Sequence, residues 1–172
     1  MIRVVVDDLA FLQSDAIVRP ATARLDSTTP AVRRLERVGG SEFLNRLRLQ
    51  KDLPVGAAVV TGAGGDLAAE FVIHAVIQSE LEPVTRETVS RAWRAALAQA
   101  REWEFARITA PPLGTGAGNL ATEDAASIMV SVLKSETGQA PFPAEVCIVV
   151  ETPEEREAFE AAARAMGVGG GA

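Results

Sequence analysis

Residues 108–120 read Ile108-Thr109-Ala110-Pro111-Pro112-Leu113-Gly114-Thr115-Gly116-Ala117-Gly118-Asn119-Leu120. The segment predicts a strand that ends at two prolines, a loop with glycine at three alternate positions, and then a helix. Backbone N–H groups ahead of a helix N-terminus bind anions, and the helix dipole favours a phosphate there. The spacing is neither that of a Walker A loop nor that of the usual dinucleotide fingerprint. Two alternatives stay open, a phosphate-binding loop or a glycine-rich turn that only redirects the chain.

Short apolar runs alternate with longer amphipathic segments along the rest of the chain. Strands are predicted at residues 2–6, 15–18, 57–61, 70–77, 107–110 and 145–150. Helices are predicted at residues 85–104, 122–134 and 153–166, and two short helices at residues 30–49, broken at Gly39-Gly40. This alternation is typical of an α/β protein with helices on both sides of a largely buried sheet. Ligands of such sheets bind at the carboxyl ends of the strands.

The 172 residues predict one domain, residues 1–166, followed by a flexible glycine-rich tail at residues 167–172. The composition, 48% hydrophobic and 23% charged, is that of a globular protein and excludes a disordered chain. The net charge of -6 weighs against general nucleic-acid binding, although one anionic ligand in a local pocket stays compatible with it.

Metal-binding and redox residues are scarce. With one cysteine, Cys147, and one histidine, His74, the sequence predicts no disulfide, no metal site and no cofactor. His74 lies in an apolar strand and is predicted to be a core residue. The sequence shows no signal peptide and no apolar run of about 18–20 residues, so we expect a cytoplasmic protein without a membrane partner.

The chain resembles the macro domain family in several segments that follow one another in the family's order. These are the first strand with Asp7-Asp8-Leu9 and residues 14–18, residues 53–64 with 71–76, residues 112–118, and residues 146–150 with the acidic helix after them. The resemblance extends from residue 2 to residue 166. It implies a three-layer α/β/α fold with a mixed central sheet, and a cleft for ADP-ribose or a related nucleotide diphosphate.

The resemblance also implies roles for individual residues. Asp8 matches the acid that binds the adenine amino group, although an aspartate at a strand end can equally cap the next turn. Leu9 matches the neighbour whose backbone lies near the ring. The loop that wraps the diphosphate and the distal ribose corresponds to Gly114, Thr115, Gly116, Ala117, Gly118, Asn119 and Leu120, with backbone donors from Gly116, Ala117 and Gly118.

The chain departs from the family in its first ligand loop. Residues 18–22 read Val18-Arg19-Pro20-Ala21-Thr22, where the family has Asn-Ala-Ala-Asn followed by a glycine triplet. Arg19 stands at the first asparagine and Thr22 at the second, and both are predicted as ligand residues. The family's hydrolases use the second asparagine and an acid after the triplet. A second departure follows the last strand, where many members have an aromatic residue that stacks on adenine and this chain has Glu151-Thr152. We therefore predict a divergent member and assign no catalytic residue.

Arg19 has two alternative roles. Its guanidinium either binds a phosphate or pairs with one of the aspartates Asp7, Asp8 and Asp15 and fills the cleft from within.

Three functions stay open on the sequence. The first is a module that binds ADP-ribose or a similar nucleotide diphosphate. The second is an ADP-ribosyl hydrolase or O-acetyl-ADP-ribose deacetylase in which Thr22, Arg24 or Asp26 replaces the missing asparagine. The third is a degenerate, non-binding fold used for contact with a protein partner or with a second copy of itself.

Overall fold

The computed structural model describes residues 1–48, 51–116, 119–136 and 138–168. Within these residues the chain forms six strands and four helices. The strands are β1 (Ile2–Val6), β2 (Ser14–Thr22), β3 (Ala58–Gly62), β4 (Ala69–Gln78), β5 (Arg107–Ala110) and β6 (Glu145–Val150). The helices are α1 (Pro30–Arg48), α2 (Arg86–Glu102), α3 (Thr122–Glu136) and α4 (Pro153–Ala165). Every predicted strand and helix is present, and the largest shift is in β2, which continues past Val18 to Thr22.

The strands form one sheet in the order β1-β6-β5-β2-β4-β3. Neighbouring strands are parallel, except that β3 runs antiparallel to β4. The sheet is therefore mixed, as the resemblance implies. Because β1, β6, β5 and β2 are parallel neighbours, their carboxyl ends lie along one edge of the sheet, where the loops that follow them can build a single site.

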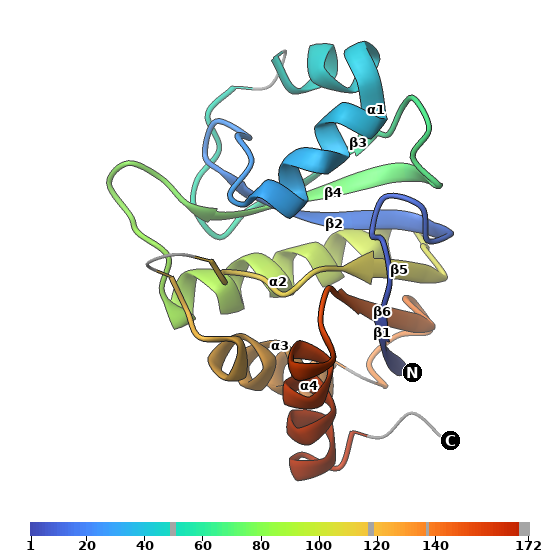
Figure 1. The fold of residues 1–172 in the computed structure, drawn as a ribbon, viewed down its shortest axis with the longest axis vertical. Helices are drawn as coiled ribbons and strands as arrows, with labels where there is room; N and C mark the ends of the chain where they lie inside the picture. The colour runs from blue at the N-terminus through green and yellow to red at the C-terminus, as the bar shows by residue number, and fades with distance from the viewer. Residues whose placement is uncertain (49–50, 117–118, 137, 169–172) are drawn as a thin grey trace.

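Helices cover both faces of the sheet (Figure 1). The helices α2, α3 and α4 pack on one face with the larger core cluster, while α1 lies on the other face. Successive residues of β2 point to opposite faces, so Val18 joins the larger core and Ile17 packs with Leu35 of α1. Because both faces are covered, β2 and β4 are almost entirely buried. The predicted three-layer α/β fold is confirmed.

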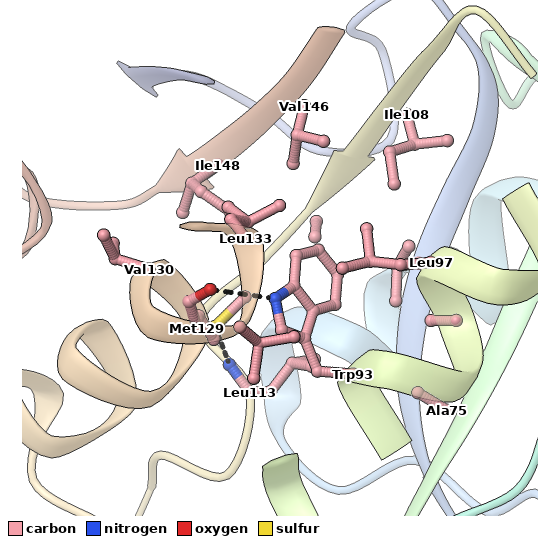
Figure 2. Packing of buried hydrophobic residues seen from close by; sticks show 14 of the residues in the cluster. Ala75, Trp93, Leu97, Ile108, Leu113, Met129, Val130, Leu133, Val146 and Ile148 are labelled. Atoms are coloured by element: carbon pink, nitrogen blue, oxygen red, sulfur yellow. Dashed lines mark hydrogen bonds between the residues drawn. The ribbon is translucent and has the colours of Figure 1, made fainter. Parts of the chain in front are cut away.

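The loop that follows β5 is anchored in the larger core (Figure 2). Trp93 of α2 is fully buried, and its indole N–H donates a hydrogen bond to the carbonyl oxygen of Met129 in α3, 3.1 Å away. The backbone N–H of Leu113, which is also fully buried, donates to the sulfur of Met129 over 3.4 Å. Buried contacts with α2 and α3 therefore fix the start of the glycine-rich loop.

The helix α1 bends at Gly40, whose φ of +74° is a conformation that favours glycine. The bend confirms the predicted break at Gly39-Gly40. Beyond it Phe43 is fully buried, and its ring stacks on His74 of β4 with 5.9 Å between the ring centroids. The half of the helix before the bend, from Pro30, is the half that contributes to the site described below.

Among the described helices, none combines the length and the apolar character that crossing a bilayer requires. At the C-terminus, Val168 packs against the core and its N–H donates to the carbonyl oxygen of Ala163, 2.9 Å away. The rest of the predicted tail, residues 169–172, lies outside the described residues, and the predicted domain boundary at residue 166 stays a prediction.

Candidate functional site

A cleft of about 720 Å³ opens at the carboxyl ends of the strands. Its walls come from the loops after β1, β2, β5 and β6 and from the beginnings of α1, α3 and α4. The residues that line it are Asp7, Asp8, Leu9, Ala10, Thr29, Pro30, Val32, Arg34, Leu35, Pro111, Pro112, Thr115, Gly116, Thr122, Val149, Glu151 and Glu155. Small-molecule sites have volumes of about 300–1,000 Å³, so a nucleotide is within the size range of this cleft.

The glycine-rich loop forms one wall of the cleft. Thr115 and Gly116 line it, and the loop is closed by the Leu120 N–H, which donates to the Gly114 carbonyl over 2.9 Å. The Asn119 N–H similarly donates to the Gly116 carbonyl over 3.1 Å. Of the predicted loop residues, Thr115 and Gly116 therefore reach the cleft, while Gly114, Asn119 and Leu120 shape the loop. The predicted donors Ala117 and Gly118 lie outside the described residues.

Three helices begin at the cleft, and each N-terminus carries partial positive charge. Thr29 precedes α1 and accepts the N–H of Val32 on its side-chain oxygen over 3.3 Å. Thr122 is the first residue of α3. Glu155 lies in the first turn of α4, and its N–H donates to the side chain of the N-cap residue Thr152. The three N-termini favour an anionic group inside the cleft.

Asp8 binds both its own loop and α1. Its Oδ1 accepts the N–H of Ala10 over 3.0 Å, and its Oδ2 lies 2.9 Å from the Nη2 atom of Arg34. The Arg34 guanidinium also lies over the ring of Phe11, 5.8 Å from its centroid. Asp8 thus stabilises the turn after β1, as the capping alternative predicts, and it also lines the cleft beside Leu9, while its binding of adenine stays a prediction.

The end of the cleft at β1 and β6 is acidic. Asp7, Asp8, Glu151 and Glu155 line it. Partial burial raises the pKa of Glu155 above its usual value, and the charge of Glu151 adds to this rise. Arg34 is the one cationic side chain among the described lining residues. The acids form no metal site, since no group of three His, Cys, Asp or Glu side chains within the described ranges could hold an ion.

Arg19 does not line the cleft, which corrects its assignment as a ligand residue. Its side chain is fully buried between β2 and α1, where Nη2 lies 2.7 Å from the Oε1 atom of Glu36. The same nitrogen donates to the Leu25 carbonyl over 2.7 Å and to the Ser27 hydroxyl over 3.3 Å. Burial lowers the pKa of Arg19 and the Glu36 carboxylate opposes this change. Arg19 therefore pairs with Glu36 and not with any of the three aspartates proposed from the sequence.

His74 is a fully buried core residue, as predicted. Its Nδ1 lies 3.4 Å from the Nη1 atom of Arg19, and its Nε2 lies 2.8 Å from the hydroxyl of Thr61. Because a guanidinium only donates, Nδ1 accepts, and the proton on Nε2 is donated to Thr61. Burial, and then the charge of Arg19, lower the pKa of His74 well below its usual value. The ring is a neutral link between β4, β3 and β2.

Thr22 also lies outside the cleft lining, contrary to its predicted ligand role. Its hydroxyl accepts the N–H of Asp26 over 3.1 Å, and its own N–H donates to the Asp26 carbonyl over 3.1 Å. Leu25, with a φ of +64°, lies in the turn that these bonds close. Arg24 is exposed and lies within 3.8 Å of Asp52 and Glu80. The three residues proposed to replace the missing asparagine are therefore not among the cleft residues.

Sequence reasoning missed several lining residues, which are Thr29, Pro30, Val32, Arg34, Leu35, Thr122, Val149 and Glu155. Most of them lie at helix starts. The sequence did contain a signal for these positions, because each predicted helix begins directly after a loop that leaves the carboxyl end of a strand. Arg34 had no such signal, since its contact with Asp8 joins two segments that the sequence does not bring together.

Comparisons with known proteins agree with this fold. The family model described as "Macro domain" matches residues 18–129. An uncharacterized protein of Aquifex aeolicus is 35% identical over 161 residues, which cover 92% of this chain and 95% of the relative. An uncharacterized protein of Aeropyrum pernix is 32% identical over 171 residues, which cover 95% of this chain and 86% of the relative. A mutant of the Oceanobacillus iheyensis macrodomain solved with ADPR has a TM-score of 0.84 at 19% identity, covering 95% of this chain and 91% of that chain. The chain belongs to the macro domain family.

Proposed function

We propose that this chain binds ADP-ribose, or a related nucleotide diphosphate, in the cleft at the carboxyl ends of the strands. The composition of the cleft carries the proposal. An aspartate after β1, a glycine-rich loop after β5 and the N-termini of three helices face one volume of about 720 Å³. The fold supports the same class of ligand, since the similar Oceanobacillus iheyensis structure is one with ADPR.

We assign the adenine to the end of the cleft at β1 and β6. A carboxylate has about four acceptor sites, so Asp8 can accept a hydrogen bond from the adenine amino group while it keeps its hydrogen bond from the Ala10 N–H and its ion pair with Arg34. Leu9 lies beside this position and its backbone would border the ring. The flat guanidinium of Arg34, held over Phe11, offers a surface on which a base can stack where the chain lacks the family's aromatic.

We assign the diphosphate to the opposite end, between the loop after β5 and the beginnings of α1 and α3. Thr115 and Gly116 face Thr29 there, and a Cβ at Gly116 would lie 3.4 Å from the Thr29 methyl group. Helix N-termini and backbone N–H groups bind phosphate without a cationic side chain. This arrangement separates the negative diphosphate from the acids Glu151 and Glu155 at the other end. Donors from Ala117 and Gly118 stay a prediction.

Binding is favoured over hydrolysis because none of the candidates for the missing asparagine, Thr22, Arg24 and Asp26, lines the cleft. Thr22 and Asp26 bond to each other in the turn after β2, and the residues of α1 that line the cleft, Pro30, Val32, Arg34 and Leu35, include neither a carboxylate nor an amide. A water would need a carboxylate or amide at that wall to be positioned for attack. The predicted cytoplasmic location and the predicted contact with a protein partner or a second copy stay predictions.

Calorimetric titration with ADP-ribose, with AMP and NAD as comparisons, tests the proposal. We expect micromolar affinity for ADP-ribose in the wild type. Thr115→Glu places a carboxylate where the diphosphate is assigned and should reduce that affinity at least about thirtyfold, since close like charges cost several kcal/mol. The matched control is Ser131→Glu, which adds the same charge on the exposed side of α3.

Two results would overturn the proposal. One is an absence of binding at millimolar ADP-ribose to the folded wild type. The other is equal affinity in Thr115→Glu and Ser131→Glu, which would place any bound nucleotide outside this cleft.

A further inference from the structure

A second hollow of about 270 Å³ lies beside the cleft and is formed by α1 alone. Its lining residues are Pro30, Arg33, Glu36, Arg37 and Leu44. The helix bends at Gly40, so Leu44 comes from the half beyond the bend and the other four from the half before it. Pro30 lines both the hollow and the cleft. The hollow therefore adjoins the end of the cleft to which we assign the diphosphate and any part of the ligand that extends past the diphosphate.

Arg33 and Arg37 are unusual among the arginines of this acidic chain. Most arginines lie at ion-pair distance from a carboxylate, as in Arg34 with Asp8 or Arg107 with Glu145. Within the described residues, Arg33 and Arg37 have no such partner, and both side chains are exposed. Two uncompensated guanidinium groups therefore line one hollow of a protein whose net charge is -6.

Glu36 does not neutralise this pair, although it lines the same hollow. Its Oε1 atom already lies 2.7 Å from the buried guanidinium of Arg19, and it also accepts the hydroxyl hydrogen of Ser27. The carboxylate is thus balanced from inside the protein, and the local charge that faces solvent is positive. An anionic group carried on the ligand beyond the diphosphate would meet these two arginines.

The chemistry of the hollow favours an acidic polypeptide over a polyphosphate chain. Two exposed arginines neutralise too few phosphates to hold a nucleic acid against the net negative charge of the protein. Residues four apart on a helix have Cβ atoms about 5–6 Å apart, and alternate side chains of an extended peptide are about 6.7 Å apart, so two carboxylates can match Arg33 and Arg37. Pro30 and Leu44 offer apolar surface to the methylene groups of such side chains.

We propose that this hollow is a docking site for an acidic polypeptide segment attached to the nucleotide in the cleft. The inference rests on the proposed function. Nucleotide binding holds the attached segment at high local concentration, so weak contacts become measurable. Exposed ion pairs contribute little each, and we expect about a two- to fivefold gain in affinity per arginine. The partner is thus a protein with Glu or Asp beside the residue that carries the nucleotide.

The test compares two ADP-ribosylated peptides that differ in their flanking residues, one with glutamates and one with glutamines. Free ADP-ribose is titrated against every variant. We expect the wild type to bind the glutamate peptide about four- to twenty-five-fold more tightly than the glutamine peptide, and this difference to shrink at high salt. Arg33→Gln with Arg37→Gln should abolish the difference and leave the affinity for free ADP-ribose unchanged.

Arg48→Gln is the matched control, since Arg48 is an exposed arginine of the same helix that does not line the hollow. It should keep the difference between the peptides. Equal affinity of the two peptides for a wild type that binds free ADP-ribose would overturn this inference alone. Tighter binding of an ADP-ribosylated oligonucleotide than of the glutamate peptide would overturn the assignment to a polypeptide. Failure of free ADP-ribose to bind would overturn the proposed function and this inference with it.

Discussion

Arg19 of β2 and Glu36 of α1 form an ion pair across 2.7 Å, although the arginine is fully buried and the glutamate reaches the surface. The same guanidinium nitrogen donates to the Leu25 carbonyl and the Ser27 hydroxyl. One buried cation thus holds the sheet, the loop after β2 and the first half of α1 together. That loop leads to Thr29 and Pro30, so the pair positions a wall of the cleft without touching it.

Removing the buried cation should destabilise the fold. Arg19→Met keeps much of the side-chain volume but leaves the Glu36 carboxylate without a cation and the Leu25 carbonyl without its donor, so we expect the free energy of unfolding to fall by about 3–5 kcal/mol. Urea denaturation measures the change. The double variant Arg19→Met with Glu36→Leu should recover part of the lost free energy of unfolding, because both charged groups of the ion pair are then removed and neither is left without its partner. An unchanged urea midpoint in Arg19→Met would contradict this account.

His74 should stay neutral in the folded protein through the range in which histidine normally titrates. Burial and the charge of Arg19 hold its pKa well below the usual value, whereas the unfolded chain takes up a proton near pH 6.5. The free energy of unfolding should therefore decrease as the pH falls below 6.5, by at most about 1.4 kcal/mol per pH unit, until the folded pKa is reached. His74 is the one histidine, so its Hε1 resonance can be followed directly by NMR. A titration step near pH 6.5 in the folded protein would show this to be wrong.

The fold could be predicted from the sequence because its signals are local. Apolar runs marked all six strands, and the two glycines at residues 39–40 marked the bend in α1. The end of β2 was missed because Arg19 and Pro20 interrupt its apolar run, and both are buried by contacts with other elements. Pairing with β4 as far as Thr22 overrides the local preference there.

The site could be predicted only in part, because its side chains meet across long sequence separations. Asp8, Leu9, Thr115 and Gly116 follow strand ends, and topology alone brings them to the cleft. The partner of Arg19 was mistaken, since any of several acids could have reached it and only the placement of α1 selects Glu36. Arg34 was missed for the same reason, as its contact depends on which face of α1 turns toward β1.

Replacement by alanine should destabilise the protein more at Gly114 than at a glycine that has a similar backbone conformation but open space around it. Both Gly114 and Gly138 have a positive φ, of +82° and +85°. A Cβ at Gly114 would lie 2.6 Å from the Cγ2 atom of Val89, whereas a Cβ at Gly138 meets nothing within 4 Å. Gly138→Ala should therefore cost about 1 kcal/mol of backbone strain, and Gly114→Ala about 1–3 kcal/mol more from overpacking. Equal losses in thermal or urea denaturation would mean that Val89 and the loop can move apart freely.

Asp8 should determine the preference for adenine. If its carboxylate accepts the adenine amino group, Asp8→Asn should weaken ADP-ribose binding by about 1.5 kcal/mol or more, which is at least about tenfold. The wild type should also prefer ADP-ribose to the hypoxanthine analogue, in which a carbonyl oxygen replaces the amino group and faces the carboxylate. Asp8→Asn should remove that preference, because an amide can donate to the oxygen.

Asp7→Asn is the control for this experiment, since Asp7 also lines the cleft and its loss removes the same charge. Its Oδ1 accepts the N–H of Asp8 over 2.7 Å, a bond that an asparagine oxygen can keep. We expect Asp7→Asn to change the affinity for both nucleotides alike and to retain the preference for adenine. If Asp7→Asn and Asp8→Asn shift the two affinities equally, the effect is one of net charge alone, and the assignment of the adenine to Asp8 is wrong.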